Sequence, residues 1–130
     1  MEIAKKDIKD RIEKMLDDET NYVYTLALEN ILSVVDMYSN DDDLIGSESL
    51  LDDALYYIDN DCNSTSYYSS EVLQYEEDFD AVCRSTYEND YLQEIDDNTS
   101  LFKGAKEVLS DMYTYCMRVA TSALINRLFN

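Results

Sequence analysis

The sequence predicts an all-α fold, a compact bundle of about five helices with a long C-terminal helix and acidic loops. The chain has no Pro and only two Gly, so the turn residues that strand-rich folds need at regular spacing are missing. Apolar residues recur at helical spacing, whereas alternation with a period of two is not sustained anywhere. With 45% hydrophobic residues, the 130-residue chain can bury a core as one domain, residues 1–130.

Two helices are expected in the N-terminal part of the chain. The first covers residues 3–16, and one face of it carries Ile8, Ile12 and Met15. The second begins near Thr20, after three acidic residues that favour the positive end of its dipole. It is apolar on nearly all sides up to Met37, so we expect it to be central and buried.

An acidic loop is expected at residues 39–47, followed by a third helix. Ser49 is a suitable N-cap for that helix, and Asp52 is placed three residues later as in a capping box. Apolar spacing then indicates a helix face made of Leu50, Leu51, Ala54, Leu55 and Ile58.

A second acidic loop is expected at residues 59–63, and Thr65 or Ser66 opens the next helix. We expect this helix to continue as far as Cys83, and a short further piece to lie around residues 87–95. The last helix has good capping residues at 98–100 and apolar residues at helical spacing up to Leu128. It is expected to span nearly 30 residues, or about 40 Å.

Charge is distributed very unevenly along the chain. There are 29 acidic and 10 basic residues and no His, which gives a net charge of −19. Residues 36–97, which we call the acidic segment, contain 19 acidic residues and a single base, Arg84. Arg84 is interpreted as an internal counter-ion. The regions on either side together contain nearly equal numbers of acidic and basic residues. We therefore expect them to form a scaffold that supports the acidic segment.

Such a chain should be repelled by nucleic acid and by anionic membranes and attracted to basic surfaces, of which the strongest belong to nucleic-acid-binding proteins. The net charge of the acidic segment equals that of about 30 Å of B-form duplex, at one charge per roughly 1.7 Å. The simpler alternative is that the acidity only confers solubility. That alternative does not explain why one segment is acidic while its neighbours are balanced.

Most enzyme chemistry is disfavoured by composition. Without His there is no Ser-His or Cys-His pair and no His metal site, and no Gly-rich phosphate loop is present. Asp59-x-Asp61-x-Asn63 begins like an EF-hand loop, but Ser64 stands where Gly is needed and Ser70 where Glu is needed. We therefore expect no catalysis, no cofactor and no metal, and a structural calcium-binding protein remains as a third class of function.

The chain is expected in the cytoplasm, with its thiols reduced. Its three Cys are widely spaced and odd in number, which does not suggest a disulfide framework. The first 14 residues are too polar for a signal peptide, and no apolar run is long enough for a transmembrane helix.

The acidic segment resembles the Ocr-like antirestriction proteins of phages, best over residues 50–75. The family's pattern of L-x-D-A-I, D-N and Y-Y before an acidic-apolar helix corresponds here to Leu51–Leu55, Asp59–Asn60, Tyr67–Tyr68 and Glu71–Leu73. The helix around residues 106–113 is similar to the family's C-terminal helix. The best-known form of the family has a strongly acidic C-terminus, whereas residues 117–130 here are slightly basic, and residues 63–66 are an addition to the family pattern.

The resemblance implies an all-α homodimer that mimics bent B-form DNA and occupies the DNA groove of type I restriction–modification enzymes. Our leading hypothesis is a phage-encoded DNA mimic that inhibits a host restriction or CRISPR enzyme and binds neither nucleic acid nor membrane. The carboxylates expected to replace phosphates are Asp41, Asp42, Asp43, Asp52, Asp53, Asp59, Asp61, Glu71, Glu76, Glu77, Asp78, Asp80, Glu88, Asp90, Glu94, Asp96 and Asp97. The alternative is an acidic binding or chaperone-like module without DNA shape. Tyr67 and Tyr68 are expected to pack in the core.

Overall fold

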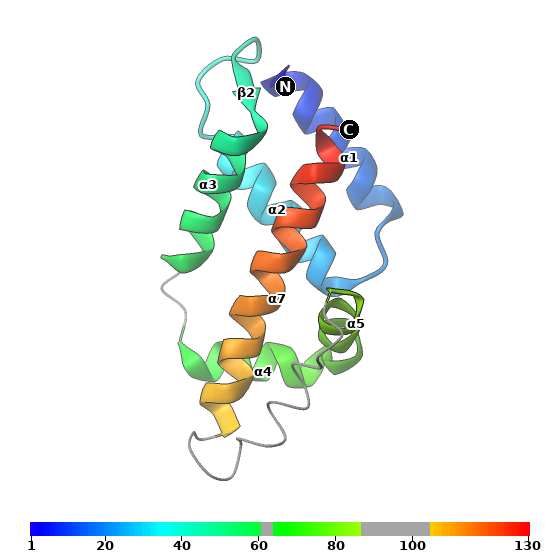
Figure 1. Ribbon diagram of the computed structural model, residues 1–130, viewed down its shortest axis with the longest axis vertical. Coiled ribbons are helices and arrows are strands. Elements are labelled where there is room, and N and C mark those ends of the chain that lie inside the picture. The colour runs from blue at the N-terminus through cyan, green and yellow to red at the C-terminus, as the bar shows by residue number, and fades with distance from the viewer. Residues whose placement is uncertain (61–63, 87–104) are drawn as a thin grey trace.

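Helices account for nearly all regular structure in the computed structural model, which describes residues 1–60, 64–86 and 105–130 (Figure 1). The predicted all-α class with a long C-terminal helix is confirmed. The helices are α1 (Lys5–Asp18), α2 (Tyr22–Val35), α3 (Ser47–Asp59), α4 (Thr65–Gln74), α5 (Glu76–Thr86) and α7 (Ala105–Leu128). The predicted piece at 87–95 and the predicted caps at 98–100 lie outside the described residues.

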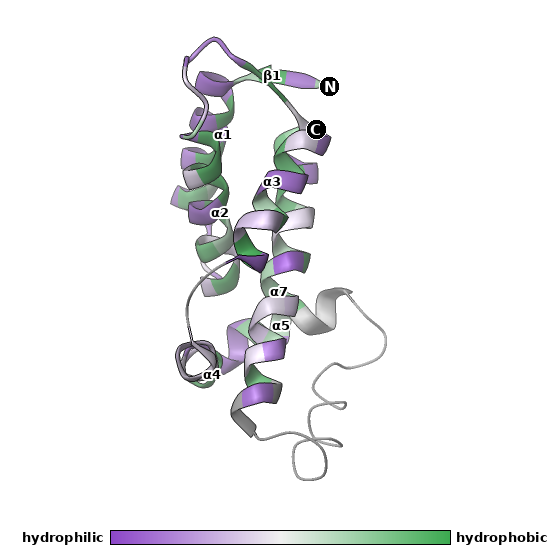
Figure 2. Cartoon of the chain, turned by 90° about the vertical axis from the view of Figure 1, so that its left-hand side faces the viewer, coloured by the Kyte–Doolittle hydropathy of each residue, from purple (hydrophilic) through white to green (hydrophobic). Residues whose placement is uncertain are grey.

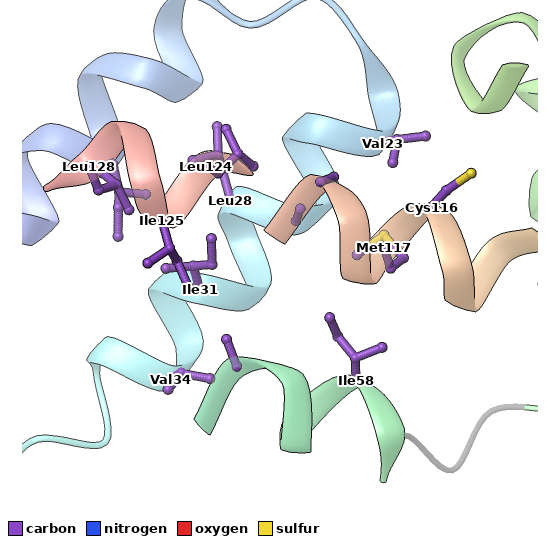
Figure 3. Packing of buried hydrophobic residues seen from close by; sticks show 14 of the residues in the cluster. Val23, Leu28, Ile31, Val34, Ile58, Cys116, Met117, Leu124, Ile125 and Leu128 are labelled. Atoms are coloured by element: carbon purple, nitrogen blue, oxygen red, sulfur yellow. The ribbon is translucent and has the colours of Figure 1, made fainter. Parts of the chain in front are cut away.

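The C-terminal helix α7 is the centre of the fold, and α1, α2, α3, α4 and α5 all pack against it. Its 24 described residues span about 36 Å. Figure 3 shows how its C-terminal half meets α2, with Ile125 of α7 close to Ile31 of α2 within one buried cluster. The helix α2 was expected to be central and buried, but six of its 14 residues are buried and α7 takes the central position.

The start of α2 is fixed by side chains from two parts of the chain. The Asn21 side-chain oxygen accepts hydrogen bonds from the backbone N–H groups of Val23 at 2.8 Å and Tyr24 at 3.4 Å. An Asp78 carboxylate oxygen accepts another from the Tyr22 N–H at 2.9 Å. Of the acids predicted to serve this terminus, Asp17 and Asp18 instead end α1. Glu19 stays at this terminus as predicted, because its carboxylate accepts hydrogen bonds from the Thr20 N–H at 3.0 Å and the Asn21 N–H at 3.1 Å. The negative charge at the N-terminus of α2 therefore comes from Glu19 and from Asp78, which is 56 positions from Tyr22 in the sequence.

A two-stranded antiparallel sheet was not predicted. Strands β1 (Glu2–Ala4) and β2 (Leu44–Gly46) pair with Ile3 opposite Ile45, so the predictions of a helix from residue 3 and a loop through residue 47 are wrong there. Loop carbonyls before β2 accept hydrogen bonds from the Lys5 and Lys6 N–H groups, and these bonds satisfy the first donors of α1.

The third helix begins two residues earlier than its predicted capping box. Gly46 is the N-cap of α3, and no side chain caps it. The Ser49–Asp52 capping box is therefore wrong, because β2 runs directly into the helix and Ser49 already lies within its first turn. The predicted core positions Leu50, Ala54 and Ile58 are buried as expected.

Residues 65–83 were predicted to form one helix, and the structure divides them at Tyr75. The Ser64 side chain accepts a hydrogen bond from the Tyr67 N–H and caps α4, and the Tyr75 backbone leaves the helical region (φ −120°, ψ 40°) before α5 begins. The Tyr75 ring stacks on Tyr22 with 3.6 Å between ring centroids. The break turns both Val72 and Phe79 towards the core, whereas Leu73 remains 61% exposed.

The core contains one defect that a mutation can repair. Thr121 of α7 is completely buried, and its hydroxyl oxygen has no hydrogen-bond partner within residues 1–60, 64–86 and 105–130. Thr121→Val should raise the free energy of unfolding by about 1 kcal/mol, because a valine methyl replaces an unsatisfied buried hydroxyl. Urea denaturation measures the change.

Thr25→Val is the matched control, because the Thr25 hydroxyl donates to the Asn21 carbonyl at 3.0 Å. We expect no gain from this control. Equal stabilisation by both substitutions would show that the orphaned hydroxyl is not the cause.

Candidate interaction surface

Eleven of the seventeen predicted phosphate mimics belong to the described residues, and none of these eleven is fully buried. The other six, Asp61, Glu88, Asp90, Glu94, Asp96 and Asp97, lie outside them, and so does the side chain of Arg84. Exposed carboxylates are those of Asp41, Asp42, Asp52, Asp53, Asp59, Glu76 and Glu77. The half-buried ones belong to Asp43, Glu71, Asp78 and Asp80.

The outer face of α3 carries a row of acids. Asp52 and Asp59 are seven residues apart and point away from the buried face of the helix, and the ring of Tyr56, which is 70% exposed, lies between them. Glu48 extends the row by one turn and is exposed, although it was missed at the sequence level. Its position four residues before Asp52 could have indicated it.

The loop that leads into β2 adds further acids at the end of the molecule where α3 begins. Figure 2, which views the molecule from the side of α3, shows the top of this loop in the hydrophilic colour. Asp41 and Asp42 are exposed, and Asp42 forms an ion pair with Lys6 at 3.2 Å. Asp43 is more constrained, because its carboxylate accepts a hydrogen bond from the Asn40 N–H at 2.9 Å. The first two acids are therefore better placed than Asp43 to meet a partner.

Two of the half-buried acids join α2 to α4 and α5. The Tyr22 hydroxyl donates a hydrogen bond to the Glu71 carboxylate, while the Tyr22 N–H donates to Asp78. Burial raises the pKa of the Tyr22 hydroxyl well above its usual range, and the Glu71 carboxylate raises it further. Glu71 and Asp78 are thus committed to holding the helices together, which sequence reasoning did not distinguish from a role in binding.

The described acids do not form one continuous row. Helices α3 and α5 both pack on α7 but lie on opposite sides of it in Figure 1, with α4 across the end of the molecule below them. The structure therefore brings the acids of α3 together with those of the loop before β2. Glu76, Glu77, Asp78 and Asp80 of α5 are placed on another flank.

Charge density along α3 can be compared with that of DNA. From Glu48 to Asp59 the helix rises by about 16 Å, a length over which a duplex carries about ten charges. The outer face provides three acids over this length, and Asp59 is partly neutralised because Arg118 donates to both of its carboxylate oxygens at 2.6 Å. One helix face alone therefore supplies less than half the charge density of a duplex.

A tyrosine-rich groove next to α3 was missed at the sequence level. It has a volume of about 1030 Å³, and its lining includes Tyr38, Tyr56, Tyr57, Tyr67 and Tyr113. The expectation of core packing holds for Tyr68, which stacks on Tyr113 at 4.3 Å between centroids, but is wrong for Tyr67, which is 41% exposed. The groove joins residues from α2, α3, α4 and α7, so no single helical pattern indicated it.

Searches against protein-family models, curated proteins and solved structures found no match for the chain. The resemblance to Ocr-like proteins therefore stays a prediction. Within residues 1–60, 64–86 and 105–130, no helix is long and apolar enough to cross a membrane. The same residues contain no group of three or more His, Cys, Asp or Glu side chains that could hold a metal ion.

The Tyr22–Glu71 hydrogen bond should be important for stability. Tyr22→Phe should lower the free energy of unfolding at neutral pH by about 1–2 kcal/mol, because it leaves a half-buried carboxylate without this donor. Tyr24→Phe is the control, since no hydrogen bond in the described residues engages the Tyr24 hydroxyl. Denaturant titration measures both variants.

The same bond predicts a pH dependence with a defined sign. A pKa raised by folding means that the fold favours the neutral phenol, so its contribution is complete below the unfolded-state pKa of about 10 and is lost as pH rises above it. Stability should therefore fall more steeply above pH 10 in the wild type than in Tyr22→Phe. Identical slopes would contradict this assignment.

Proposed function

We propose that this protein is a DNA mimic encoded by a phage, and that it inhibits a host defence enzyme by occupying its DNA-binding groove. The target would be a type I restriction–modification enzyme or a CRISPR nuclease. The protein itself performs no catalysis in this proposal. Its carboxylates take the positions of phosphates and satisfy the Lys and Arg side chains that normally hold DNA.

The observation that supports the proposal most is the set of exposed acids that the fold does not use. No hydrogen bond or ion pair within the described part of the chain engages the carboxylates of Asp41, Asp52, Glu76 and Glu77. Each of them adds to the repulsion within a chain of net charge −19. Acids kept at that cost are better explained by a basic partner than by folding.

A second function is favoured by a different observation. The described acids occupy two flanks, and the α3 face has a lower charge density than a duplex. Both features suit an acidic module that binds a basic protein without imitating the shape of DNA. The two functions differ in whether duplex DNA and the protein compete for the same site on the partner.

Competition therefore provides the test. The purified protein is added to type I restriction enzymes and CRISPR nucleases, and cleavage or binding of duplex DNA is measured at increasing salt. A DNA mimic should block at least one enzyme, be displaced by excess duplex and lose affinity steeply with salt. Inhibition that excess duplex does not reverse would favour the acidic module, and failure against every enzyme at low salt would refute the DNA mimic.

Neutralisation of the unused acids should weaken inhibition in a graded way. A variant with Asp41→Asn, Asp52→Asn, Glu76→Gln and Glu77→Gln should raise the inhibition constant by about tenfold to a hundredfold, since exposed charge pairs contribute about 0.2–1 kcal/mol each. Each single substitution should change it by less than about fivefold. Dose–response curves against the inhibited enzyme measure these constants.

The control removes the same charge from α1, outside the acidic segment. It carries Asp7→Asn, Asp10→Asn, Glu13→Gln and Asp17→Asn, four exposed positions. We expect it to inhibit nearly as well as the wild type. Equal loss in both variants would show that net charge alone is responsible, and complete loss from one substitution would contradict distributed mimicry.

The proposal includes a homodimer in the cytoplasm of the host cell, as the resemblance implies. Two copies would double the length of DNA that the acids could imitate. Light scattering after size-exclusion chromatography decides between a monomer and a dimer.

A further inference from the structure

The tyrosine-rich groove differs in chemistry from the acidic row on the outer face of α3. It lies between α2 and α3, and the segment from Met37 to Asp43, α4 and α7 complete its wall. Its volume of about 1030 Å³ is at the upper end of the range for ligand pockets, about 300–1000 Å³. The groove is therefore large enough to hold several side chains of a polypeptide, well beyond a single small group.

Aromatic rings and carboxylates occur together in this lining. Tyr56 and Tyr57 contribute from α3, Tyr67 from α4, and Leu26 and Val34 provide apolar surface from α2. Asp43 and Asp53 line the same groove, and no Lys or Arg is among its described lining residues. Tyrosine faces attract cations, and a carboxylate beside them can pair with the same cation.

Asp53 and Tyr38 are neighbours in the lining of the groove. Burial raises the pKa of the Tyr38 hydroxyl, and the nearby Asp53 carboxylate raises it further. The Tyr38 backbone carbonyl accepts a hydrogen bond from the Lys5 ammonium group at 2.5 Å, which helps to hold this part of the wall in place. Asp53 itself is exposed, so its carboxylate can pair with a cation that enters the groove.

Charge decides among the candidate occupants. A second copy of this chain would bring another net charge of −19 towards Asp43 and Asp53. A basic segment would instead gain from both carboxylates and from the acids of α3 around the groove. Arg fits better than Lys, because its planar guanidinium stacks on aromatic rings and pairs with carboxylates through two N–H groups.

We propose that this groove binds an arginine side chain presented by a basic protein segment, with the guanidinium against the tyrosine rings and paired with Asp53. Apolar neighbours of that arginine fill the remainder of the groove beside Leu26 and Val34. The proposal rests on the proposed function only in taking the partner to be basic. It adds a point of recognition that DNA does not possess, so affinity for the partner does not come from phosphate mimicry alone.

Two adjacent residues of α3 provide the test. Asp53 lines the groove, whereas Asp52 lies on the outer face, so Asp53→Asn and Asp52→Asn remove the same charge one residue apart. The probe is the peptide acetyl-Ala-Leu-Arg-Leu-Ala-amide, and the same peptide with citrulline in place of arginine is the neutral control. Chemical shifts of the 15N-labelled full-length protein give the dissociation constant and show which amides respond.

We expect the arginine peptide to shift the amides of Tyr56, Tyr57 and Asn30, and the citrulline peptide to bind at least about tenfold more weakly. Asp53→Asn should weaken binding of the arginine peptide about tenfold, and Asp52→Asn less than about twofold. Tyr56→Ala is a second variant that should also weaken binding, and since the ring is 70% exposed its removal leaves the fold intact. Circular dichroism of each variant checks the fold.

Equal losses in Asp52→Asn and Asp53→Asn, or equal binding of the two peptides, would overturn the proposal. If the wild type is a dimer and Tyr56→Ala is a monomer, the groove binds a second copy of the chain, and the proposal is overturned. Failure of the proposed function is a separate result. In that case no nuclease is inhibited, while the arginine peptide still binds the groove. The dissociation constants of the wild type, Asp52→Asn and Asp53→Asn still follow the predicted order.

Discussion

Repulsion among carboxylates opposes the folding of this chain. A chain with a net charge of −19 folds only if the burial of apolar side chains offsets that repulsion. The central helix α7 makes this burial possible, because the other five described helices pack on it. Polar residues are almost excluded from the described core, where only Lys5, Ser69 and Thr121 are buried. No described carboxylate is fully buried, so the acids of the described residues lie at the surface or at its margins.

The acids at the surface fall into two groups, those whose carboxylates form hydrogen bonds or ion pairs within the described residues and those whose carboxylates do not. Glu71 and Asp78 accept hydrogen bonds from Tyr22 and hold three helices together, and Asp43 orders its own turn. Asp41 and Asp52 have no such contact within the described residues. Composition alone treats all of these acids as equivalent candidates for binding. The contacts distinguish acids that stabilise the fold from acids whose carboxylates make no such contact within the described residues. The acids of the second group are the better candidates for binding a basic partner.

The helices could be predicted because their apolar faces repeat over three or more turns, as Leu50, Ala54 and Ile58 do in α3. The strands could not, because β1 and β2 have three residues each and show no period. The break at Tyr75 contains no Gly or Pro, and stacking on Tyr22, which is distant in sequence, fixes it. The acidic character of the candidate surface was evident from the sequence. The division of the acids between two flanks depends on how the helices pack, and so does the tyrosine-rich groove. Neither feature produces a local pattern in the sequence.

The repulsion among the exposed acids can be measured through the dependence of stability on salt. If the exposed acids repel one another and are offset by the core around α7, screening must stabilise the fold. The free energy of unfolding, measured by urea denaturation from about 0.02 M to about 0.5 M NaCl, should rise steadily as the Debye length falls from roughly 20 Å to below 5 Å. A free energy that stays constant or falls over this range would show that the acids are compensated within the fold, and would contradict the account.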